Sequence, residues 1–127
     1  MKDQALLAAF ESATLETFHH ADHVHMAFLY LNRYPAPEAL ARFSAALAHF
    51  AEAKGKPGLY HETITWAYFL LIRERMARAA GRPSWEAFAA ANPDLLNWKE
   101  SVLKKYYKEE TLASDLARAA FLMPDRI

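Results

Sequence analysis

The chain has 127 residues, which is enough for one domain and too few for two of ordinary size. Fifteen basic residues balance fifteen acidic ones, so the net charge lacks the basic excess that a general nucleic-acid binder needs. No cysteine is present, which excludes disulfides, thiolate metal ligands and cysteine nucleophiles. Three glycines are too few for a P-loop or a dinucleotide-binding fingerprint.

The predicted elements are all helices, because alanine, leucine and glutamate are abundant and β-branched residues are sparse. Proline and glycine mark the stops, with Gly55 and Gly81 at positions suited to helix C-caps and Ser84 suited to an N-cap. In chain order, the expected helices cover residues 3–13, 20–33, 37–54, 59–80, 84–92, 94–106 and 111–121. We therefore predict an all-α, single-domain antiparallel helical bundle over residues 1–127, with four main helices plus short ones.

The apolar runs of the sequence are short. None approaches the ~18 residues that a membrane span needs, and the first residues do not resemble a secretory signal. We therefore expect a cytoplasmic protein that binds neither membranes nor nucleic acid.

Histidines occur in two groups near predicted helix starts. His20 and His23 are one helical turn apart on an apolar face, and His61 shares a face with other apolar residues in a later helix. Short connections make successive helices antiparallel, so the helices that carry the two groups should run parallel. This topology predicts that the three imidazoles meet at one end of the bundle.

Neutral imidazoles with a nearby carboxylate suit a divalent metal. We therefore expect His20, His23 and His61 to be metal ligands, with Glu62 a fourth ligand or the base that acts on a metal-bound water. Zinc, iron, nickel and manganese all accept such donors, and an open coordination position would support hydrolysis. The H-E-x-x-H zinc motif is absent, because Thr65 stands at its second histidine position.

Neighbouring side chains complete the predicted site. Those expected to line a small-molecule pocket are Tyr60, Thr65, Trp66 and Tyr68. Those expected to hydrogen-bond to the imidazoles from behind are Tyr106, Tyr107 and Glu110.

Three other interpretations stay open. The histidines can be half-buried structural residues. They can also serve a metal-free enzyme, with His20, His23 or His61 as general base and Glu62 or Tyr60 as its partner. Finally, the stretch 26–31 is apolar on all sides, which favours a non-catalytic helical module that associates into a homodimer.

Several segments carry a resemblance to other proteins. They are FHHADHV at residues 18–24, GKPGLYHETITW at 55–66, NPDLLNWKES at 92–101 and YYKEETLAS at 106–114. In these segments the sequence resembles a group of small bacterial proteins whose function is not established, so the resemblance implies no activity. In architecture the chain also resembles DinB-type bundles, which bind a metal through three histidines. Their histidine spacing differs, and no ligand role is carried over.

Overall fold

The computed structural model describes residues 3–126, and in this range all regular structure is helical and no strand occurs. The predicted all-α class is therefore confirmed. The chain divides into two compact units, the first ending at Tyr60 and the second beginning at His61. The expectation of a single domain over residues 1–127 stays a prediction.

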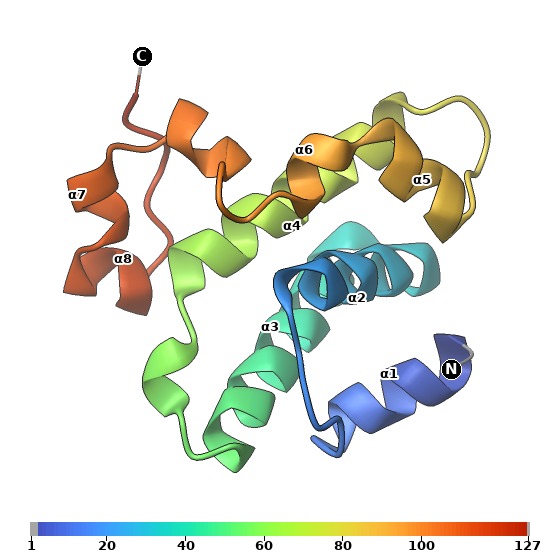
Figure 1. The fold of residues 1–127 in the computed structure, drawn as a ribbon, viewed down its shortest axis with the longest axis horizontal. Helices are drawn as coiled ribbons and strands as arrows, with labels where there is room; N and C mark the ends of the chain where they lie inside the picture. Colours follow the sequence, from blue (N-terminus) through green and yellow to red (C-terminus); the bar gives the residue numbers. More distant parts are fainter. Residues whose placement is uncertain (1–2, 127) are drawn as a thin grey trace. The chain divides into compact units, whose positions relative to one another are not determined.

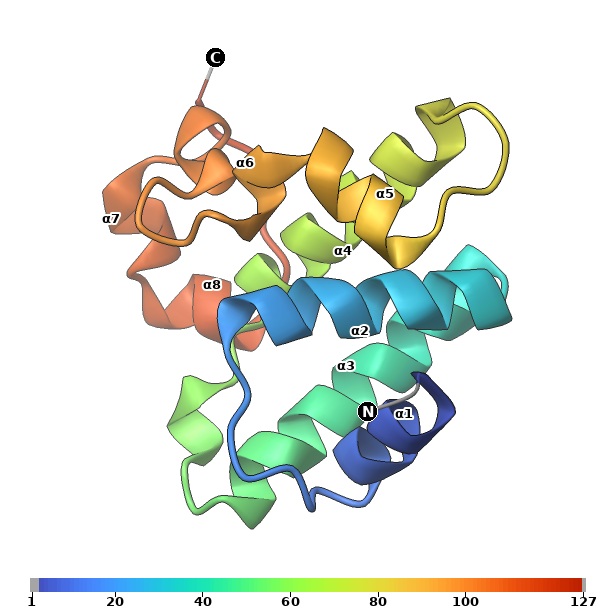
Figure 2. The ribbon, with the colours of Figure 1, turned by 45° about the vertical axis from the view of Figure 1, so that its right-hand side comes forward.

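The first unit contains three helices and a short 3₁₀ turn. They are α1 (Asp3–Glu11), α2 (His20–Arg33), α3 (Ala36–Ala53) and η1 (Pro57–Leu59). Each of the three helices contacts the other two (Figures 1 and 2). The bounds of α2 are those predicted. α3 begins after Pro35 and has Pro37 in its first turn, where a missing N–H and a fixed φ suit a helix start.

Aromatic side chains fill the interior of the first unit. The ring of Phe10 on α1 lies 5.9 Å from the rings of both Phe43 and Phe50 on α3, centroid to centroid. Tyr30 on α2 lies 5.7 Å from Phe43, and its hydroxyl donates a 2.7 Å hydrogen bond to Glu11. This enclosed setting and the carboxylate both raise the pKa of Tyr30 above its ordinary value.

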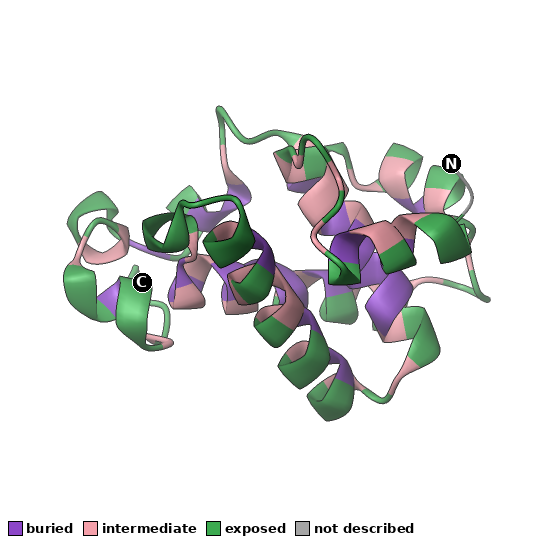
Figure 3. Cartoon of the chain, turned by 90° about the horizontal axis from the view of Figure 1, so that it is seen from below, coloured by how far each residue is buried: buried purple, intermediate pink, exposed green. Residues whose placement is uncertain are grey.

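The second unit has one long helix and several short ones. They are α4 (Glu62–Arg78), α5 (Trp85–Ala91), α6 (Pro93–Leu96), η2 (Val102–Lys105), α7 (Glu109–Leu112) and α8 (Asp115–Ala119). α4 contacts α8 and η2, so it is the element around which this unit is built (Figure 1). The longer helices carry buried and exposed residues on different sides, as expected of amphipathic segments (Figure 3).

Several predicted caps are confirmed. Gly55 follows the C-cap Lys54 of α3 with a φ of 73°, a conformation that costs glycine little. Gly81 also has a positive φ, 69°, but it does not cap α4, because that helix already ends at the extended Ala79. The Ser84 side chain accepts the Ala87 N–H at the start of α5. α4 is shorter at both ends than the predicted 59–80, because the residues around Pro57 form the separate turn η1 and Ala79 is already extended.

The predicted helix from Asp94 to Tyr106 is wrong. α6 ends at Leu96, and the Asn97 side chain then accepts the Glu100 N–H, which forms a turn instead of a helix. The Ser101 hydroxyl accepts the Leu103 N–H and starts η2. Local hydrogen bonds from short polar side chains therefore replace the helical ladder.

The predicted helix over residues 111–121 is also divided. Its break lies at Ser114, whose hydroxyl donates to the Thr111 carbonyl oxygen and accepts the Ala117 N–H. Ser114 thus ends α7 and caps α8 at the same time. Beyond α8, Ala120 is extended and residues 121–126 have no regular secondary structure.

Candidate functional site

The first histidine group lies at the start of α2. His20 is the first residue of the helix and His23 follows one turn later, with ring centroids 6.1 Å apart. Both side chains are half-buried. The predicted proximity of these two imidazoles is therefore present within the first unit.

His23 belongs to the aromatic interior. Its ring centroid lies 5.2 Å from that of Phe43 and 6.4 Å from that of Phe18. Burial and, to a smaller extent, the neighbouring His20 together lower the pKa of His23 to about 3. The imidazole is consequently neutral at pH 7, the form that can bind a metal, but it is a poor general base.

His61 caps α4. Its Nδ1 accepts the Ile64 N–H at 3.1 Å, so this nitrogen carries no proton. The proton is on Nε2, which donates to the Leu112 carbonyl oxygen at 2.8 Å. That carbonyl is at the end of α7, where the helix itself provides no donor. His61 thus joins the start of α4 to the end of α7.

This geometry bears on the predicted metal site. Both ring nitrogens of His61 are already engaged inside the second unit, so metal binding through His61 requires one of these hydrogen bonds to break. His20 and His23 belong to the first unit, and the convergence of all three imidazoles stays a prediction. Within residues 3–126, no group of three or more His, Asp or Glu side chains is arranged to hold a metal ion.

The residues predicted to line a pocket differ in how far they are buried and in what they contact. Thr65 and Tyr68 are buried, with 2% and 0% of their surface exposed. Trp66 is half-buried, and its ring stacks on Phe121 at 5.5 Å. Tyr60 ends the first unit, whereas Glu62 is the half-buried first residue of α4.

The residues predicted to support the imidazoles make other contacts. Tyr107 is buried and donates its hydroxyl proton to the Leu122 carbonyl oxygen at 2.7 Å. Tyr106 is 38% exposed, and Glu110 is exposed in the first turn of α7. Tyr107 therefore holds the segment that follows α8.

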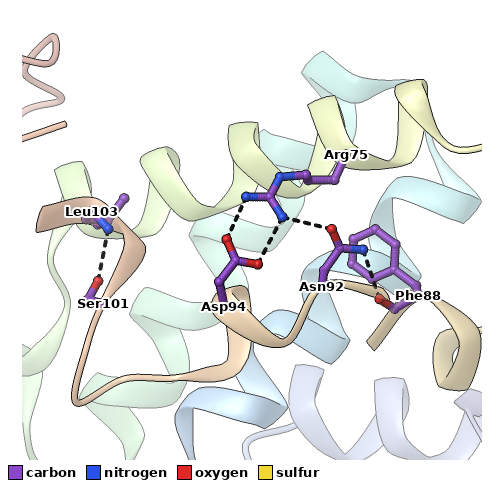
Figure 4. Close-up of polar contacts among 6 residues, drawn as sticks. All are labelled: Arg75, Phe88, Asn92, Asp94, Ser101 and Leu103. Atoms are coloured by element: carbon purple, nitrogen blue, oxygen red, sulfur yellow. Dashed lines mark hydrogen bonds and ion pairs between the residues drawn. The ribbon is translucent and has the colours of Figure 1, made fainter. Parts of the chain in front are cut away.

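A polar cluster that the sequence did not reveal lies along α4 (Figure 4). Arg75 forms a two-pronged pair with Asp94, at 2.8 and 3.0 Å, and also donates to Asn92 at 2.8 Å. The guanidinium keeps the pKa of Asp94 below its ordinary value. Asn92, the residue between α5 and α6, donates to the Phe88 carbonyl oxygen and so ties α5 to the same cluster.

Two further residues of the NPDLLNWKES segment contact Tyr68 on α4. Tyr68 and Ser101 share a 2.6 Å hydrogen bond between their hydroxyls, and the Trp98 ring lies 6.3 Å from the Tyr68 ring. The polar residues of this segment thus attach the chain after α5 to α4. These residues lie 17 to 33 positions away from their partners in the sequence. The periodicity of apolar residues within one helix cannot predict contacts over such separations.

Comparison of this chain with protein-family models, curated proteins and solved structures found no match. None of the helices in the described part of the chain has both the length and the apolar character of a bilayer-spanning segment.

Proposed function

We propose that this protein is a helical interaction module that associates with itself. The observation that carries the proposal is the exposure of Trp98, half of whose surface (52%) is open. Tryptophan is the residue type most enriched at the energetic centres of protein interfaces, because its large ring loses little conformational entropy when it is covered.

Trp98 is held in place from behind. Its ring lies against Tyr68, which is itself fixed by the Ser101 hydroxyl. Tyr106, which follows η2, is 38% exposed and interacts electrostatically with Arg75 of α4. Such pre-positioned side chains bind at low entropic cost, since little ordering remains to be done.

A second copy of the chain is a suitable partner on electrostatic grounds. The formal net charge is zero, so two copies approach one another without net repulsion. The apolar stretch at residues 26–31, from which the sequence predicts self-association, gives no support to it, however. Residues Met26–Tyr30 are all buried, so the apolar stretch on α2 offers little surface to a partner.

Replacing Trp98 with alanine tests this proposal. We expect the dissociation constant of the dimer to rise at least about tenfold, because a central interface tryptophan is worth ~2 kcal/mol or more. Sedimentation equilibrium of wild type and Trp98→Ala over a concentration series measures the change. Trp85→Ala is a matched control, since Trp85 is a half-buried tryptophan on α5. A wild-type chain that stays monomeric throughout the series would refute the proposal.

The His20–His23 pair supports a second candidate function, a divalent-metal site. Two imidazoles one turn apart, of which His23 is neutral, form half of a nitrogen-donor set. Water or substrate would fill the remaining positions, and Glu62 and His61 are the further ligands that the sequence predicts. A metal with open positions would lower the pKa of its bound water and support hydrolysis.

Metal analysis of untagged protein tests this second candidate. We expect one equivalent of zinc, iron, nickel or manganese in the wild type and a loss of most of it in His20→Ala, since one of two strong donors is removed. His49→Ala removes an exposed histidine of α3 and should retain the metal. Equal metal content in His20→Ala and wild type would rule this site out.

A further inference from the structure

Two regions of the second unit expose a large apolar side chain among charges, and the charges of the two regions have opposite signs. Trp98, in the turn between α6 and η2, is 52% exposed. Leu116, in the first turn of α8, is 63% exposed. Trp98 carries the proposed self-association, and the charges around it indicate which surface of a second copy it contacts.

Lysines surround Trp98. Lys99 follows it directly, and Lys104 and Lys105 form the last turn of η2; all three are exposed. The Lys104 ammonium donates to the Lys99 carbonyl oxygen at 3.2 Å, which brings the end of η2 against the turn that carries Trp98. One glutamate, Glu100, lies among them and pairs with Lys104 at 3.7 Å, so Lys99 and Lys105 make the region positive. We call Trp98, Lys99, Lys104 and Lys105 the basic surface.

Leu116 has acidic neighbours. Glu109 and Glu110 are exposed in the first turn of α7, and Asp115 is exposed in the first turn of α8. α7 and α8 contact one another near the start of α4, so these carboxylates and Leu116 lie on adjoining helices (Figure 1). Arg118 is the one basic residue of the two helices, which leaves them with a negative net charge. We call Glu109, Glu110, Asp115 and Leu116 the acidic surface.

Most of these charges have no use within the chain. The side chains of the two surfaces that form no ion pair within residues 3–126 include Lys99, Lys105, Glu110 and Asp115. Charges in this state are available to a partner of the opposite sign, and they steer its approach and fix its orientation. The basic and acidic surfaces are complementary in this sense, and each places one large apolar side chain among its charges.

We propose that two copies of the chain associate about a two-fold axis, with the basic surface of each copy on the acidic surface of the other. Trp98 of one copy then contacts Leu116 of the partner subunit. The two-fold axis makes this contact twice, because a residue pair that meets once in such a dimer meets again in the reciprocal position. An apolar centre with a polar rim is the common anatomy of a protein interface. The inference rests on the proposed self-association and names the surface that Trp98 covers.

Reversing the charges of one surface at a time tests this pairing in the full-length chain. Lys99→Glu with Lys105→Glu makes both surfaces acidic, and Glu110→Lys with Asp115→Lys makes both basic. Either double variant alone should raise the dissociation constant of the dimer at least about tenfold, since like charges then face one another. Sedimentation equilibrium over a concentration series measures the constants, at ~0.1 M salt, where exposed charges still interact over ~10 Å.

Two further samples restore the complementary charges. An equimolar mixture of the two double variants pairs an acidic chain with a basic one, and its mixed dimer should form within about threefold of the wild-type dissociation constant. A chain that carries all four substitutions has the signs of its two surfaces exchanged and a formal net charge of zero. It should dimerise as the wild type does, which separates the pairing of the surfaces from an effect of net charge.

Matched controls accompany these variants. Lys56→Glu with Arg82→Glu changes the net charge by the same amount at exposed residues outside both surfaces, and should leave dimerisation unchanged. Leu116→Ala should raise the dissociation constant at least about tenfold, because it removes the apolar partner of Trp98 without altering any charge. Leu59→Ala truncates a leucine of η1 that is 69% exposed, and should have no such effect.

The outcomes separate this pairing from self-association as such. Dimers of wild-type strength in both charge-reversed variants and in Leu116→Ala would overturn the pairing and leave self-association through Trp98 standing. A chain with all four substitutions that stays monomeric while the wild type dimerises would have the same meaning. A monomeric wild type would instead refute the proposed self-association itself.

A polyanion is the other occupant that a basic surface with an exposed tryptophan can take. Fluorescence anisotropy of a labelled oligothymidylate, titrated with wild type and with Lys99→Glu and Lys105→Glu combined, measures this. We expect no saturable binding. Binding that the double variant loses, with dimerisation unchanged, would overturn the pairing and assign the basic surface to single-stranded nucleic acid.

Discussion

Replacing His61 with alanine is expected to lower the free energy of unfolding by about 2–3 kcal/mol. Two losses add up. The Ile64 N–H at the start of α4 loses its acceptor, and loss of an N-cap costs about 1 kcal/mol. The Leu112 carbonyl oxygen loses its donor in a part-buried place, which costs about 1–2 kcal/mol more. Urea denaturation followed by circular dichroism measures the sum.

His61→Asn separates the two losses. An asparagine side chain can accept the Ile64 N–H as a good N-cap, but it is too short to reach α7 as the imidazole does. We therefore expect His61→Asn to be more stable than His61→Ala by about 1 kcal/mol and still less stable than wild type. If both variants unfold at the wild-type urea concentration, His61 has no structural role, and its two hydrogen bonds contribute nothing measurable to stability.

The sequence predicts a helix well where residues next to the helix determine its ends. α2 runs from His20 to Arg33 as predicted, because Pro35 stops it within two residues. α5 starts as predicted at Ser84, a residue type that caps helices well. Composition and punctuation are local properties, so elements that depend on them can be found without knowledge of tertiary contacts.

The short elements after α6 were not predictable in this way. An apolar spacing from Leu95 to Tyr106 exists, but Asn97 and Ser101 bind the backbone next to them and interrupt the helix. Apolar periodicity detects the buried face and is blind to this competition. Asn97 and Ser101, four residues apart, are of types that favour turns, and they are the signal for turns in this part of the sequence.

The candidate site was predictable only in part. The adjacency of His20 and His23 follows from helical geometry and is present. The role of His61 depends on Leu112, 51 residues later, and that of Arg75 on Asp94, 19 residues later. Pairings over such separations arise from the packing of short elements, whose lengths the sequence did not predict. For this reason the sequence predicts that Tyr107 supports the imidazoles, whereas its hydroxyl donates to the Leu122 carbonyl oxygen.

His23 is expected to make the protein acid-sensitive. Its pKa is about 3 in the folded chain, against about 6.5 for a free imidazole, because burial among Phe18 and Phe43 disfavours the charged form. Above about pH 7 the imidazole is neutral in both states and stability does not depend on it. As the pH falls from about 6.5 toward 3, only the unfolded chain takes up the proton, and stability is lost.

The expected loss through this group is about 1.4 kcal/mol per pH unit between about pH 6 and pH 4. His23→Phe keeps a flat ring against Phe18 and Phe43 and cannot be protonated, so its free energy of unfolding should fall less steeply with acid. His49→Gln removes a histidine from the exposed side of α3 and should keep the wild-type slope. Urea denaturation of the three proteins from pH 7.5 to pH 4, with a chelator present, compares the slopes. The outcome against this prediction is an equal pH dependence of the free energy of unfolding for wild type and His23→Phe. It would mean that water reaches the His23 imidazole in the folded chain and that the surrounding aromatic rings open.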